Sequence, residues 1–130
     1  MEFFIQIYNC DEKRFRVFIN SSNSILFKKF NEVSRNPKTV NKFTLVIESV
    51  KLGISNRKQF NWEGKCEYGD IYAIKVDSHR FYSVFLNIEG YRNLYLCRYG
   101  RKQSNKNDKT LNSIISSINK IEIQKFFKDE

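Results

Sequence analysis

The sequence contains few of the side chains that bind metals or form disulfides. Among its 130 residues there are one His and three Cys, and Cys10, Cys66 and Cys97 lie far apart with no CxxC spacing. Zinc sites need several such ligands at short spacings, and pairing three cysteines leaves one over. We therefore expect no metal, no cofactor and no disulfide, with free thiols in a reducing cytoplasm.

Glycine and proline are also scarce, with five Gly and one Pro. No glycine-rich phosphate loop can be assembled from them, and no Ser, His and Asp set indicates a hydrolytic triad. The N-terminal stretch MEFFIQIYNC has a short apolar run and no small-residue cleavage site, so we expect neither a signal peptide nor a membrane span. The length and the globular composition favour one cytoplasmic domain over residues 1–130.

Acidic residues are outnumbered: 14 Asp and Glu stand against 23 Lys and Arg, for a net charge of +9. Such an excess on a small domain indicates a polyanionic partner, namely RNA, DNA, a ribosome or an acidic protein. A Lys- and Asn-rich sequence from an AT-rich genome would carry the same excess without any such partner. The cations cluster after residue 90, which favours the polyanion.

Apolar residues alternate with polar ones in several short runs, which predicts β-strands. The runs are residues 3–8, 14–19, 71–76, 80–86 and 92–98. In the run 71–76, one face carries Tyr72, Ile74 and Val76 and the other carries Ala73 and Lys75. A four-residue loop, Asn87 to Gly90, joins the last two runs, and residues 54–69 read as a loop with at most one short strand.

Three helices are expected from capping residues and helical periodicity. The first follows Ser21–Ser24 and ends at Asn36-Pro37, and the second is capped by Thr39 and ends at Gly53. The third is capped by Asn107 or Asp108 and carries an apolar stripe from Leu111 to Ile121. The prediction is an α+β fold: a small antiparallel β-sheet with two N-terminal helices and one C-terminal helix.

The second half of the chain resembles the RelE/ParE superfamily of type II toxin–antitoxin systems. The stretch IYAIKVDSHRFYSVF, followed by NLYLCRYGRKQSNKND, is similar to the family's three strands and double-basic step. Lys75 matches the family's cation on the first of these strands, Arg80 the arginine that opens the second, and Arg101-Lys102 the double-basic step. The length and the RKQSNK continuation are most similar to the HigB-like, phage-derived branch.

This resemblance implies a toxin that cleaves messenger RNA on the ribosome and thereby inhibits translation. In such an mRNA interferase the 2′-hydroxyl of the RNA attacks the adjacent phosphate, so the protein supplies proton transfer and cations. The candidate catalytic residues are Arg80, Lys75, His79 and Tyr99. The candidate RNA- and phosphate-binding residues are Arg98, Arg101, Lys102 and Lys106.

Other interpretations of the same residues remain open. Arg80 would be a surface cation if it paired with Asp77 or Asp70, and Tyr99 would be a core residue if its ring were packed inside. The domain would be a ParE-like, non-enzymatic inhibitor of DNA gyrase, or a non-toxic basic module that binds nucleic acid. The toxin hypotheses imply a cognate antitoxin that forms a hetero-oligomer with this chain.

Overall fold

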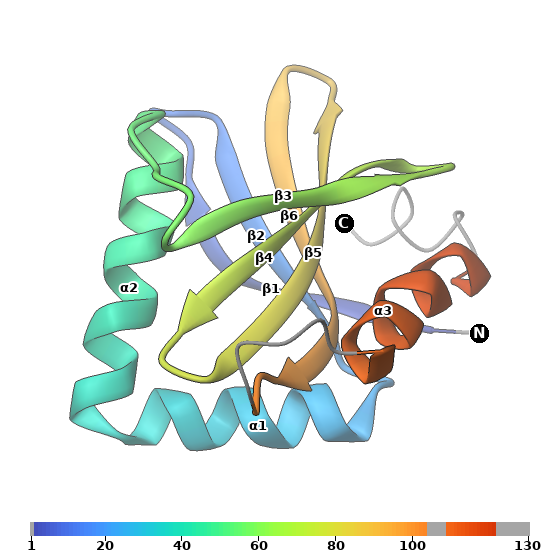
Figure 1. The fold of residues 1–130 in the computed structure, drawn as a ribbon. Coiled ribbons are helices and arrows are strands. Elements are labelled where there is room, and N and C mark those ends of the chain that lie inside the picture. The colour runs from blue at the N-terminus through green and yellow to red at the C-terminus, as the bar shows by residue number, and fades with distance from the viewer. Residues whose placement is uncertain (1, 104–108, 122–130) are drawn as a thin grey trace.

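One six-stranded β-sheet organises the chain, and helices cover both of its faces (Figure 1). We describe it from a computed structural model, in which residues 2–103 and 109–121 are described. The strands are β1 (Phe4–Cys10), β2 (Phe15–Asn20), β3 (Phe60–Cys66), β4 (Gly69–Val76), β5 (His79–Ile88) and β6 (Tyr91–Arg101). The helices are α1 (Ser24–Arg35), α2 (Pro37–Leu52) and α3 (Lys109–Ser116), and a 3₁₀ turn, η1 (Ser117–Lys120), follows α3.

The predicted small antiparallel sheet with two N-terminal helices is wrong. The strand order is β1-β2-β6-β5-β4-β3, and β2 pairs with β6 in parallel, so the sheet is mixed. The hairpin β1–β2 precedes both α1 and α2. Alternation identifies strands but not their partners, and a parallel pair needs a long crossover, which here runs through α1, α2 and the strands β3 to β5.

Residues 54–69 were predicted to be loop with at most one short strand, and the structure places β3 there although its sequence contains residues that are depleted in strands. Its sequence is FNWEGKC, and Gly64 has φ +133° at a shift of register opposite β4. A β-bulge at this glycine lets a sequence with weak strand propensity remain paired with its neighbour.

Two hydrophobic cores lie on opposite faces of the sheet. Helices α1 and α2 pack on one face, and α3 with η1 packs on the other. The predicted alternation of β4 is confirmed, because Ile74 and Val76 are buried under α1 and α2 whereas Ala73 is buried under α3. A Cβ on Gly100 of β6 would lie 2.5 Å from Leu111 Cδ2, so α3 approaches the backbone of the sheet at this glycine.

The corner between α1 and α2 is fixed by Asn36. This residue ends α1 and caps α2, where its side chain accepts a hydrogen bond from Lys38 N and Pro37 occupies the first turn. The prediction that Thr39 caps α2 is wrong, since its hydroxyl instead donates to the carbonyl of Val33. The predicted end of α2 at Gly53 is confirmed, with φ +73° at the cap.

The turn between β5 and β6 has two residues and not the predicted four, because Ile88 pairs directly with Tyr91. Both of its residues have positive φ, +52° at Glu89 and +83° at Gly90, as a type I′ turn requires. The three cysteines are free thiols, as predicted. Across residues 2–103 and 109–121, no helix combines the length and the apolar character that crossing a bilayer requires.

Candidate functional site

The single histidine of the chain is paired with a tyrosine near the ends of β5 and β6. His79 Nδ1 lies 2.6 Å from the hydroxyl oxygen of Tyr99, a hydrogen-bonding distance. Both rings also contact Phe81, a fully buried residue of the core under α1 and α2. The aromatic core therefore holds the imidazole in one orientation, half-buried at the rim of the sheet.

Burial and neighbouring charges change the acidity of this pair. Burial lowers the pKa of His79 below its usual value, and the charges of Arg101 and Lys29 lower that pKa further. Burial likewise raises the pKa of the Tyr99 hydroxyl. At neutral pH the imidazole is therefore uncharged, and an uncharged imidazole can accept a proton.

A cavity of about 180 Å³ opens beside His79 where α1 meets the ends of the strands. Its lining comes from α1, the α1–α2 corner, β5 and β6, and is mostly polar or charged. The residues are Lys29, Glu32, Val33, Asn36, Thr39, His79 and Arg101. No group of three His, Cys, Asp or Glu side chains placed to hold a metal ion occurs among the residues that the structure describes.

The cavity is basic on balance. Arg101 and Lys29 contribute two cations, and Glu32 contributes one carboxylate, 3.4 Å from the Lys29 ammonium. Asn36, the N-cap of α2, and Thr39 in its first turn add polar groups at the N-terminal end of that helix, where the helix dipole is positive. Two cations beside an imidazole can hold a phosphate next to a proton acceptor.

The structure does not bring the four predicted catalytic residues together. Lys75 and Arg80 pair directly with each other across β4 and β5. Their neighbours along the strands face α1 and α2. Because side chains alternate along a strand, Lys75 and Arg80 lie on the opposite side of the sheet from His79 and Tyr99. The Arg80 guanidinium donates to the carbonyls of Asp77 and His79, at 2.7 and 3.0 Å. It therefore binds the backbone of its own hairpin.

The carboxylate of Asp77 pairs with Lys42 and not with Arg80. Lys42 Nζ lies 2.5 Å from Asp77 Oδ1, an ion pair that ties α2 to the turn between β4 and β5. The Arg80 guanidinium binds the backbone carbonyl of Asp77. This exposed ion pair links the hairpin that carries His79 to α2.

The predicted phosphate-binding residues also separate into different environments. Arg98 lies on the α3 side, where it donates to Glu2 Oε1 at 2.9 Å and to Ser117 Oγ at 3.0 Å. Arg101, by contrast, is exposed and lines the cavity beside His79. Lys102 is half-buried and its backbone N–H binds the carbonyl of Ser78, whereas Lys106 lies outside the described residues.

Sequence reasoning missed the helical half of the cavity. Lys29 and Glu32 stand on α1, which was interpreted only as an amphipathic helix packed on the sheet. Their i, i+3 spacing is the one signal available, because it places both on one helix face. Nothing in the sequence indicated that this face would meet the ends of β5 and β6, which lie more than 40 residues further along the chain.

Comparisons of the chain with protein-family models, with curated proteins and with solved structures gave no match.

Proposed function

We propose that the protein is an endoribonuclease whose active site is the cavity beside His79. The observation that carries this proposal is the position of the His79 imidazole, 2.6 Å from the Tyr99 hydroxyl and in a cavity that Arg101 and Lys29 also line. Cleavage of RNA by its own 2′-hydroxyl needs a proton acceptor and positive charge at the phosphate. The cavity offers both within one small volume.

In the proposed reaction His79 acts as the general base. We assign the tautomer in which Nδ1–H donates to the Tyr99 oxygen, which leaves Nε2 free to accept a proton. Nε2 takes the proton of the 2′-hydroxyl, the 2′-oxygen bonds to phosphorus, and the bond from phosphorus to the 5′-oxygen breaks. A water molecule protonates the leaving oxygen, and the hydroxide so formed takes the proton back from His79 Nε2. The products are a 2′,3′-cyclic phosphate and a 5′-hydroxyl, and the imidazole is neutral again.

Arg101 and Lys29 serve the phosphate in this mechanism. Both are cations of the cavity lining, and charge-assisted hydrogen bonds from such groups stabilise the crowded phosphorane more than the ground-state phosphate. Glu32 holds the Lys29 ammonium at 3.4 Å, so it is a positioning residue. Tyr99 is the second positioning residue because it orients the imidazole.

The resemblance to RelE/ParE toxins supports messenger RNA on the ribosome as the substrate. On this proposal the protein acts in the cytoplasm, blocks translation, and is neutralised by an antitoxin. The net charge of +9 supports an acidic antitoxin segment as the partner. The gyrase-inhibitor alternative has no feature of the cavity in its favour.

The test is cleavage of a defined message with and without ribosomes, followed by mapping of the new ends. We expect ends that carry 2′,3′-cyclic phosphate and 5′-hydroxyl, and no cleavage where the attacking ribose lacks its 2′-hydroxyl. His79→Ala should lower the rate by about 10²- to 10⁴-fold, the usual contribution of a general base. Lys65→Ala, which removes an exposed cation at the far end of β3, is the matched control and should cleave normally.

Two outcomes would refute the proposal. RNA that stays intact with correctly folded protein, with and without ribosomes, would exclude an endoribonuclease. Cleavage that survives His79→Ala but is lost in Arg80→Ala would move the active site to the opposite face of the sheet, where the sequence alone had placed its main cation.

A further inference from the structure

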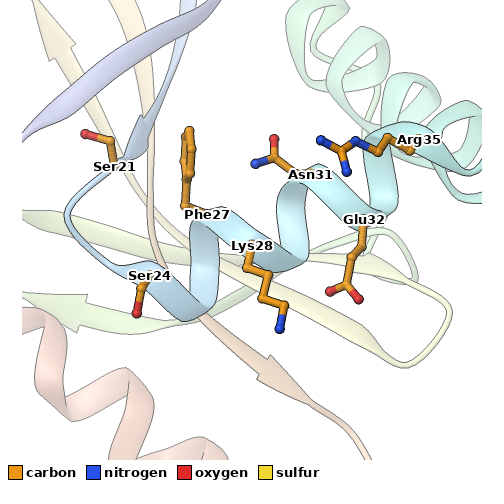
Figure 2. Close-up of a pocket in the computed structure, with 7 residues that line it drawn as sticks. All are labelled: Ser21, Ser24, Phe27, Lys28, Asn31, Glu32 and Arg35. Atoms are coloured by element: carbon orange, nitrogen blue, oxygen red, sulfur yellow. The ribbon is translucent and has the colours of Figure 1, made fainter.

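The outward face of α1 carries a groove that the cavity beside His79 does not include. The groove has a volume of about 430 Å³, within the roughly 300–1,000 Å³ that small-ligand sites occupy. Figure 2 shows its side chains on the two sides of the helix. Ser21, Phe27, Asn31 and Arg35 lie on one side, and Ser24, Lys28 and Glu32 lie on the other.

The chemistry of this groove matches a nucleotide. Phe27 is half-buried against the core under α1 and α2 and still lines the groove, so its ring is a fixed aromatic surface. Asn31, next to it on the same side of the helix (Figure 2), offers an amide donor and acceptor. Across the parts of the chain that the structure describes, neither Lys28 nor Arg35 forms an ion pair, so both are available to phosphates.

The groove adjoins the proposed active site. Glu32 lines both the groove and the cavity beside His79. Helix α1 has 12 residues and is therefore about 18 Å long at 1.5 Å per residue, enough for a few nucleotides.

We propose that this groove binds a nucleotide that flanks the scissile phosphate in single-stranded RNA. The base of that nucleotide stacks on Phe27, and Arg35 and Lys28 bind the phosphates on either side of it. This inference rests on the proposed endoribonuclease function.

The experiment measures binding separately from cleavage. The probe is a fluorescein-labelled, single-stranded RNA oligonucleotide with 2′-O-methyl riboses, which the proposed mechanism cannot cleave. Phe27→Leu keeps an apolar side chain against the core but removes the aromatic face. We expect it to bind the probe about 5- to 140-fold more weakly, as loss of one stacked base implies, and we expect Phe27→Trp to restore binding.

Two further variants test the charge and supply the control. Arg35→Gln should lower the slope of log affinity against log salt by about 0.7, as loss of one phosphate contact to a single strand implies. Ile25→Ala should bind normally, since Ile25 is 64% exposed on the same helix and does not line the groove. Equal binding by wild type, Phe27→Leu and Arg35→Gln would overturn the proposal, as would an equal loss in Ile25→Ala.

The two proposals fail in different ways. If the wild-type protein binds the probe through Phe27 but cleaves no RNA, the proposed endoribonuclease activity is refuted and nucleotide binding in the groove is supported. Wild-type protein that cleaves RNA but binds the probe equally well without the Phe27 ring would refute the groove and keep the endoribonuclease. Failure to bind any oligonucleotide would overturn the groove proposal and leave this face of α1 to an acidic protein partner.

Discussion

Arg98 and Arg101 stand three residues apart on β6, and the structure gives them opposite roles. Arg98 is held on the α3 side by Glu2, Ser117 and a backbone carbonyl, whereas Arg101 is exposed at the cavity beside His79. We therefore predict that Arg98→Ala destabilises the fold and has little effect on the rate of RNA cleavage. Arg101→Ala should lower the cleavage rate and leave the stability nearly unchanged.

The size of the effect at Arg98 follows from its contacts. Its ion pair with Glu2 is mostly shielded, with side chains 14% and 24% exposed, so its removal leaves a half-buried carboxylate without its cation. Losing charge-assisted hydrogen bonds of this kind costs about 2–3 kcal/mol in the free energy of unfolding. For a chain of this size that corresponds to a fall in Tm of ~8–12 °C. Arg101→Ala, at an exposed position, should change stability by less than about 0.5 kcal/mol.

The assay is urea unfolding followed by circular dichroism, with RNA cleavage measured on the same preparations. Arg101→Ala should keep the unfolding curve of the wild type and lose about 10²- to 10³-fold in cleavage rate, as removal of one preorganised donor implies. Glu2→Gln, combined with Arg98→Ala in a double-mutant cycle, isolates the energy of the ion pair. Normal stability with lost RNA cleavage in Arg98→Ala would refute this assignment and restore Arg98 as a phosphate ligand.

Further predictions concern His79, Gly100 and Cys97. The chain has one histidine, so its NMR titration is unambiguous: the pKa of His79 should lie below 6.5, and Arg101→Gln should raise it, because the Arg101 charge helps to lower it. Since the neutral imidazole is the proposed base, cleavage should persist below pH 6.5 and fall as the pH drops through that lowered pKa; an acid limit above pH 6.5 would contradict the assignment. Gly100→Ala should cost about 1–3 kcal/mol in urea unfolding, because its Cβ would lie 2.5 Å from Leu111 Cδ2; unchanged stability would show that α3 does not pack there. Burial raises the pKa of the Cys97 thiol, so this cysteine should resist thiol reagents until the protein unfolds, and rapid labelling of Cys97 in the native protein would argue against its burial.

Much of the secondary structure could be predicted from local pattern. The strand faces of β4, the break at Asn36-Pro37 and the αL cap at Gly53 all depend on residues close together in the chain, and such signals survive in almost any tertiary context. The predictions failed where the structure depends on pairing between segments that lie far apart in the chain. Strand β3 has weak propensity and is stabilised by its pairing with β4, and the parallel pairing of β2 with β6 joins segments separated by α1, α2 and three strands.

The candidate site shows the same division. The sequence by itself determined that a histidine, a tyrosine and several cations lie near the ends of β5 and β6. It did not determine which of them share a face. A β-bulge shifts the register between β5 and β6 at Tyr82/Ser83. Before the bulge Leu96 faces α1 and α2, and Cys97 faces α3. Simple alternation would then turn Tyr99 toward α3, but after the bulge it faces α1 and α2. One extra residue in a strand reverses the side of every residue after it. The tertiary structure alone therefore decided that Arg101 reaches the cavity and that Arg98 turns to Glu2, a residue 96 positions away.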